Sequence, residues 1–383
     1  MSIIDYSDAS FPVRDNITEA HNRYWKRLAS PGNWLTAAER IGVAKEIRQA
    51  RSCELCSKRN AALSPYQLEG QHDSVSDLSD VMVEVIHRVI TDSARLTKAW
   101  FDGIMQQDLK IEQYIEIIGT LVHVFSIDEF CRGIGEPVRE LPEPLPGEPS
   151  HYRPANIVED GDGSWVPMLS AVMQPGPESD IWEGKIEGNV IRALSLVPDE
   201  VRSLKDLLIV HYLDDEEFMD LEKSPQGTLS RIQTEVVAAR VSAFNGCFYW
   251  TTSHAVVLRV SIESSGESID LDGLTDPACT EIKGIPHSEV LLKFSNAFMA
   301  YDPEALALAR DQLAKEISPE AMVDTAAIAS NFQRMVRIAD STGIPVESMG
   351  DDMDAMVEEL NEQLGINKYV SAANSKKRWQ NIS

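Results

Sequence analysis

The chain has 383 residues, and its 61 acidic side chains outnumber its 35 basic ones, which gives a formal charge of −26. A field of that sign repels phosphate groups and argues against nucleic acids or anionic membranes as partners. Hydrophobic residues make up 43% of the sequence and charged residues 25%, which is typical of globular rather than disordered chains. At roughly 150 residues per domain, this length predicts two or three domains.

The most apolar stretch, residues 114–127, is too short to cross a membrane, because a spanning helix needs about 20 apolar residues. It contains Glu116 and His123, which share a helix face and which we interpret as a hydrogen-bonded core pair. The first 12 residues show no secretory signal. Five cysteines argue against a disulfide framework and favour a reducing, cytoplasmic location.

Prolines divide the chain. Nine of the 19 lie between Pro137 and Pro177, and proline interrupts helices, so residues 138–190 are predicted to form a proline-rich linker. Helical spacing of apolar residues recurs elsewhere and predicts an all-α protein. We therefore expect a first helical domain over 1–137, a second over 191–365, and a tail over 366–383. The clearest helical segments are 35–50, 81–90, 111–131, 230–244 and 322–340.

An internal repeat relates the two halves. A shift of 194 positions places Thr36-x-x-Glu39 on Ser230-x-x-Gln233, and both patterns are capping boxes that start a helix. The same shift places Cys53 on Cys247. Further on, Gly-x-Pro follows an apolar helical segment in each half, at 135–137 and at 343–345, and marks a helix end. The repeat predicts two related helical units.

The second half carries a candidate catalytic group. Cys247 follows an Asn-Gly break and is predicted to open a helix, where the helix dipole lowers a thiol pKa. Trp250 and His254 follow one turn apart on that helix. If the flanking helices fold back on each other, Glu235 meets His254, and the imidazole can deprotonate a thiol. The alternative is that these are ordinary core residues.

The spacing of Glu235, Cys247 and His254 resembles the alkylhydroperoxidase AhpD and carboxymuconolactone decarboxylase superfamily. The resemblance covers about 195–350, and through the repeat it extends more loosely to about 30–138. It implies two AhpD-like helical bundles in one chain, and a homo-oligomer such as a dimer or trimer. It also implies a Cys-x2-Cys pair that reduces hydroperoxides while a glutamate and a histidine relay the proton.

Each half departs from the family pattern. In the second half Trp250 stands where the family has the second cysteine. In the first half Cys53 and Cys56 keep the pair, but Ile41 and Asn60 occupy the glutamate and histidine positions. Residues Cys53 and Cys56 at a helix start can cycle between dithiol and disulfide, or can be an inert or metal-binding pair.

A zinc site would need two further ligands, and the sequence has no second Cys-x2-Cys. His72, in a polar segment, could bind a metal, but we interpret it as a solvent-exposed loop residue. No metal and no cofactor are expected.

Three functions follow from these patterns. The first is reduction of hydroperoxides by Cys53, Cys56 and Cys247, with a thiol reductant as partner. The second is cofactor-free acid–base chemistry of the decarboxylase type on a small organic acid. There Glu235 and His254 would act, with Trp250 and Tyr249 as pocket walls. The third is a non-catalytic protein that binds a ligand or serves as a scaffold.

Overall fold

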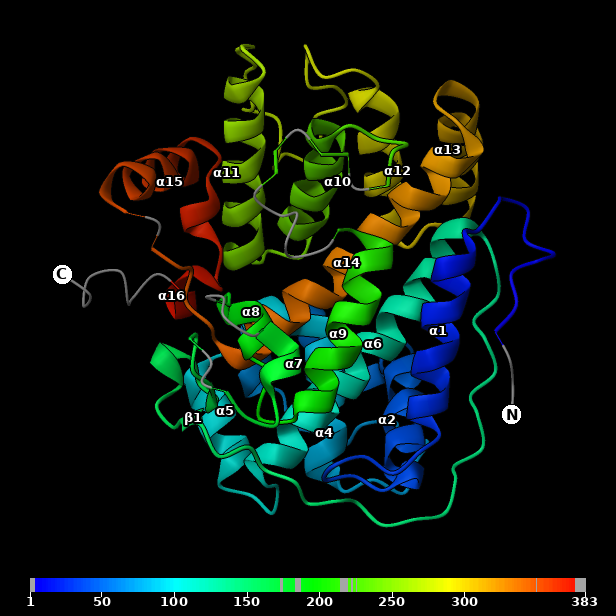
Figure 1. The fold of residues 1–383 in the computed structure, drawn as a ribbon, viewed down its shortest axis with the longest axis vertical. Coiled ribbons are helices and arrows are strands. Elements are labelled where there is room, and N and C mark those ends of the chain that lie inside the picture. The colour runs from blue at the N-terminus through cyan, green and yellow to red at the C-terminus, as the bar shows by residue number, and fades with distance from the viewer. Residues whose placement is uncertain are drawn as a thin grey trace.

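The computed structural model describes residues 4–172, 175–182, 187–213, 220–221, 223–224, 226–348 and 350–375. It is mostly helical, which confirms the all-α class (Figure 1). Across the described ranges, none of the helices is long and apolar enough to cross a membrane. The helices of the first half are α1 (Asp15–Leu28), α2 (Ala37–Ala50), α3 (Glu54–Ala61), α4 (Asp80–Asp92), α5 (Lys98–Met105) and α6 (Ile111–Ile134). Those that follow are α7 (Ser179–Trp182), α8 (Asn189–Arg192), α9 (Pro198–His211), α10 (Arg231–Phe244), α11 (Phe248–Ser264), α12 (Ser288–Ala300), α13 (Pro303–Glu316), α14 (Pro319–Thr342), α15 (Asp351–Gln363) and α16 (Ala372–Ser375).

The helix boundaries follow the local signals in the sequence. At the start of α2 the Thr36 hydroxyl accepts a hydrogen bond from the Glu39 backbone amide. At the start of α10 the Ser230 hydroxyl accepts one from the Gln233 backbone amide, so both capping boxes form. Helices α6 and α14 have 24 residues each and end at a glycine with positive φ, Gly135 at +87° and Gly343 at +60°. Glycine adopts that left-handed conformation without strain, which explains these helix ends.

Helices α6 and α14 pack along each other, and α10–α13 lie at the top of Figure 1 while α2 and α4 lie towards the bottom. One continuous apolar core contains residues of both halves, including Phe130 of α6 and Phe332 of α14. Burial of this shared surface joins the halves into one packed unit. The division into two AhpD-like domains remains a prediction.

The proline-rich segment runs over the surface. It contains β1 (Ile157–Val158) and β2 (Met168–Leu169), an antiparallel pair of two residues each, with Ile157 opposite Leu169. Backbone hydrogen bonds fasten the segment to the connection between α1 and α2, for example from the Leu145 amide to the Ala29 carbonyl. Farther along, the Trp165 amide donates to the carbonyl of Thr342, the last residue of α14.

The expected pairing of Glu116 with His123 is wrong. The His123 Nδ1 atom lies 3.2 Å from a carboxylate oxygen of Glu200 in α9, while Glu116 accepts the backbone amides of Trp34 and Leu35. Sequence spacing placed both side chains on α6, but it gave no sign that His123 would meet a carboxylate from another helix. Burial raises the pKa of Glu116 to about 7.

Candidate functional site

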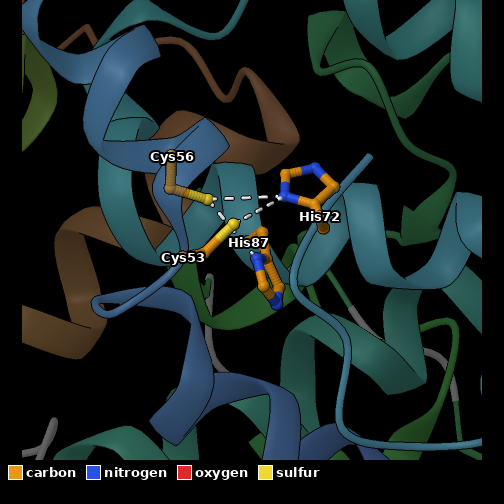
Figure 2. Close-up of side chains that lie close together, drawn as sticks. All are labelled: Cys53, Cys56, His72 and His87. Carbon is orange, nitrogen blue, oxygen red and sulfur yellow. Dashed lines mark hydrogen bonds between the residues drawn. The ribbon is translucent and has the colours of Figure 1, made fainter. Parts of the chain in front are cut away.

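Four ligand-type side chains meet at the start of α3. Cys53 is the N-cap residue of α3 and Cys56 lies in its first turn, His72 comes from the segment before α4, and His87 from α4 itself (Figure 2). The His72 Nδ1 atom is 3.5 Å from both sulfur atoms, and the His87 Nδ1 atom is 3.3 Å from the Cys56 sulfur. All four atoms lie within 4.8 Å of one another. We call these four residues the Cys/His cluster.

A carboxylate holds the far side of each imidazole. The Nε2 atom of His72 is 2.8 Å from Glu84, and that of His87 is 2.9 Å from Glu46. Glu46 is itself fixed by the hydroxyls of Ser74 and Ser76. A carboxylate can only accept, so the hydrogen bonds assign the proton of each neutral ring to Nε2. The Nδ1 lone pairs of both rings then face the sulfur atoms.

The two thiols differ in their electrostatic surroundings. Burial alone would raise the pKa of Cys53, but hydrogen bonds from the Asp73 and Cys56 amides outweigh it, and the pKa is lowered. Burial, reinforced by the charge of Cys53, raises the pKa of Cys56 to about 12. Burial lowers the pKa of His87, while for His72 the hydrogen bond with Glu84 outweighs burial and raises the pKa. Without a metal, the two pKa shifts favour the charged forms of Cys53 and His72 more than in a free thiol and a free imidazole.

A pocket of about 540 Å³ opens beside Cys56, between residues of the two halves. Among its walls are Asn60 and two arginines, Arg51 and Arg337. No carboxylate of the described residues lies within 4 Å of either guanidinium group. The Nε atom of Arg337 is buried and has no hydrogen-bond partner in the described part of the chain. The pocket therefore offers positive charge close to a thiol.

In the second half, Glu235 of α10 and His254 of α11 are in contact. The His254 Nδ1 atom lies 2.6 Å from one oxygen of Glu235, and Arg231 donates to the other oxygen at 2.8 Å. The His254 ring stacks on Trp250 with centroids 5.1 Å apart, and Phe332 meets it edge-on at 4.2 Å. The imidazole is fully buried between these two aromatic rings.

Cys247 does not join that pair. It is fully buried as the N-cap residue of α11, and its neighbour is Asp340 of α14, with no hydrogen bond to His254 among the described contacts. The expectation that the helix start lowers the Cys247 pKa is wrong. Burial, with the nearby Asp340 carboxyl, raises it well above its usual value, because an apolar surrounding disfavours the thiolate more than the dipole favours it.

Tyr249 and Trp250 line a second cavity, of about 390 Å³ and mainly apolar. Phe332 and Met335 of α14 and Tyr212 contribute to the same walls. The Tyr249 hydroxyl donates to Glu347 at 2.9 Å, so that carboxylate is already engaged at the rim. This cavity suits an apolar ligand.

Most residues of the first-half site were not predicted from the sequence. The interpretation of His72 as a solvent-exposed residue is wrong, since its side chain is only 7% exposed. His87 and Glu46 were not predicted as site residues, because helical spacing alone is equally consistent with residues on buried core faces. The available signal was the order Cys-x2-Cys-x15-His-x14-His, in which two histidines follow the cysteine pair.

Comparisons with protein-family models, curated proteins and solved structures find no match to this chain.

Proposed function

We propose that this chain is a duplicated AhpD-like oxidoreductase that reduces hydroperoxides with Cys53 and Cys56 and is recycled by a thiol reductant. One observation carries the proposal: His87 lies 3.3 Å from the Cys56 sulfur while its other nitrogen contacts Glu46. This is a carboxylate–imidazole–thiol arrangement, the form that activates a thiol as a nucleophile. Its glutamate and histidine come from positions other than those of the family pattern, in which Ile41 and Asn60 stand.

The chemistry follows from the positions of the groups. Because burial raises the pKa of Cys56, its thiol stays protonated until His87 takes the proton. The thiolate then attacks the terminal oxygen of the hydroperoxide, breaking the O–O bond. The alkoxide recovers the proton from His87 and leaves as an alcohol, with Cys56 as a sulfenic acid. The Cys53 thiolate then attacks the Cys56 sulfur and forms a disulfide, and the departing hydroxide takes a proton from His72 to become water.

The pocket beside Cys56 supports an organic anion as substrate. Arg51 and Arg337 bring two positive charges into a chain of formal charge −26. Guanidinium groups bind carboxylates through charge-assisted, often bidentate, hydrogen bonds. A hydroperoxide that carries a carboxylate would therefore be held with its peroxide group towards the sulfur.

The test is consumption of an organic hydroperoxide with dithiothreitol as reductant. We expect Cys53→Ser and Cys56→Ser to abolish turnover, and His87→Asn to lower kcat by about 10²–10⁴, the usual contribution of a proton-transferring group. Cys279→Ser, a half-exposed thiol outside the site, is the matched control and should behave as the unaltered chain. Full turnover by a folded Cys53→Ser/Cys56→Ser double variant would rule out the proposal.

The second candidate is binding of an apolar ligand in the 390 Å³ cavity. The contact between Glu235 and His254 supports acid–base chemistry there, but Trp250 and Phe332 cover the imidazole. A ligand in the cavity would meet aromatic faces before it met His254, which favours binding over catalysis. Extraction of the purified chain with organic solvent, followed by mass spectrometry, would identify such a ligand; a clean extract together with no quenching of Trp250 by apolar probes would exclude it.

A further inference from the structure

We propose that the Cys/His cluster binds one Zn²⁺ ion, with Cys53, Cys56, His72 and His87 as its four ligands. The metal site does not depend on the oxidoreductase proposal. Its consequence for reactivity does: the ion would hold the dithiol reduced, and oxidation of the two sulfurs would release it.

The spacing of the donor atoms is that of a tetrahedral zinc site. A zinc ion about 2.3 Å from each sulfur and about 2.0–2.1 Å from each nitrogen separates neighbouring sulfur and nitrogen atoms by about 3.5 Å. Three of the four sulfur–nitrogen separations are 3.5, 3.5 and 3.3 Å, and all four donor atoms lie within 4.8 Å of one another (Figure 2). A hydrogen bond between one thiol and one imidazole would explain any single one of these contacts. It would not explain why two thiols and two imidazoles come together in one place.

The orientation of the rings gives independent support. Histidine ligands of zinc commonly donate their second ring N–H to a carboxylate, which fixes the tautomer and strengthens the donor nitrogen. Both rings have such a partner, His72 in Glu84 and His87 in Glu46, at 2.8 and 2.9 Å. All four donor atoms thus present lone pairs to the same centre, apart from the protons that the thiols lose on binding a metal.

The donor set selects the metal. Two thiolates and two imidazoles suit zinc and disfavour magnesium and calcium, which prefer oxygen ligands. The two thiolate charges neutralise the ion, which permits its burial. Cys53 and His87 are fully buried and the protein supplies all four ligands, so the site is closed, as in structural zinc sites.

The local fold explains what the ion would stabilise. Cys53, Leu55 and Cys56 form an apolar cluster of only three residues, separate from the main core. The 18 residues between α3 and α4 contain one 3₁₀ turn, at Pro65–Gln67, and no other helix or strand. Zinc would join α3, this segment and α4 at one point, supplying the cohesion that so small an apolar cluster lacks.

Oxidation then couples the metal to the dithiol. Two zinc-bound thiolates, one hydroperoxide and two protons give a disulfide, an alcohol, water and free Zn²⁺. Two electrons pass from the sulfurs to the peroxide, so charge and atoms balance. A disulfide no longer offers thiolates, and two imidazoles alone bind zinc weakly.

The experiment uses the full chain, purified after expression with added zinc. We expect about one zinc per chain by elemental analysis, and Co²⁺ substitution should give thiolate-to-metal charge transfer with tetrahedral ligand-field bands. Glu46→Gln leaves all four ligands in place and tests the outer carboxylate, and zinc affinity measured with a competing chelator should fall about 10–100-fold. Cys279→Ser, outside the cluster, should keep full zinc content. A chain without zinc whose cobalt form lacks both spectral features would overturn the proposal.

The same preparation separates this proposal from the oxidoreductase proposal. Titration with hydroperoxide, followed with a zinc-sensitive dye, should release one zinc per disulfide formed. Bound zinc in a chain whose metal-free form consumes no hydroperoxide would uphold the metal site and refute the oxidoreductase. Turnover by a chain that binds neither zinc nor cobalt would do the reverse.

Discussion

Replacing Asp340 with asparagine removes a carboxyl group that the fold buries beside Cys247. Burial is the main cause that raises the pKa of Asp340, to about 7, from a usual value near 3.8. The folded chain therefore holds this proton more tightly than the unfolded chain. The resulting stabilisation is complete below the unfolded pKa and is lost as pH rises through the folded pKa.

The size of the effect follows from the two pKa values. Between about pH 5 and pH 7 the unfolded carboxyl is ionised and the folded one is protonated, a difference of one proton over two pH units. At about 1.4 kcal/mol per unit, the unfolding free energy falls by about 3 kcal/mol from this group alone. Asp340→Asn has no such proton and does not lose this stabilisation. The difference in unfolding free energy, variant minus unaltered chain, should therefore rise by about 3 kcal/mol between about pH 5 and pH 8.

Urea denaturation of both proteins across this pH range measures the difference, with the slope m compared to confirm that the same surface is exposed. All other charges, including the large acidic excess, are common to both chains and cancel in the difference. Asp311→Asn, an exposed carboxylate on α13, makes the same charge change without burial and should follow the unaltered chain. Parallel pH curves for Asp340→Asn and the unaltered chain would refute the reasoning.

Two further substitutions test the packing and the pocket. Gly343→Ala should lower the unfolding free energy by about 2–4 kcal/mol, because Gly343 has φ +60° and an added Cβ would lie 2.1 Å from the Trp165 ring. Gly266 has φ +78° with open space around it, so Gly266→Ala measures the cost of the left-handed conformation without a clash. An equal loss of unfolding free energy in both variants would contradict a clash with Trp165. Arg51→Gln should raise KM about tenfold for a hydroperoxide bearing a carboxylate and leave KM for a neutral one unchanged, as expected for one charge-assisted hydrogen bond. An equal rise in KM for both substrates would refute the proposed preference for an anionic hydroperoxide.

Features encoded by neighbouring residues were predictable from the sequence. The capping boxes at Thr36 and Ser230 form, and the glycines at 135 and 343 end their helices, because each signal acts within one helical turn. The contact of Glu235 with His254 was also foreseen. It required only that two helices joined by a short Asn-Gly break fold back on each other.

The Cys/His cluster was not predictable in the same way. His72 is 16 positions from Cys56, and His87 is 31 positions away, so only the path of the intervening segment brings them to the sulfur atoms. The pKa of Cys247 was misjudged for a related reason. The helix start is a local feature, whereas burial depends on what α14 and the other helices place over it.

The two halves carry different side chains at positions related by the shift of 194, which pairs Cys56 with Trp250 and Asn60 with His254. In the second half Trp250 stacks on the imidazole of His254, which keeps its contact with Glu235 but is enclosed. In the first half Cys56 and Asn60 both line the 540 Å³ pocket.

In the proposed reaction, the base for Cys56 approaches from another direction. His87 of α4 does so from the buried side, backed by Glu46, which leaves the pocket side of the sulfur open to a substrate. The same position brings His87 against the ring of His72, with ring centroids 4.5 Å apart, and completes the group of four donor atoms proposed to hold zinc. A histidine at position 60 would serve the proposed proton relay but would not contribute to the proposed metal site. The use of His87 therefore links the proposed reactivity of the dithiol to the proposed metal site.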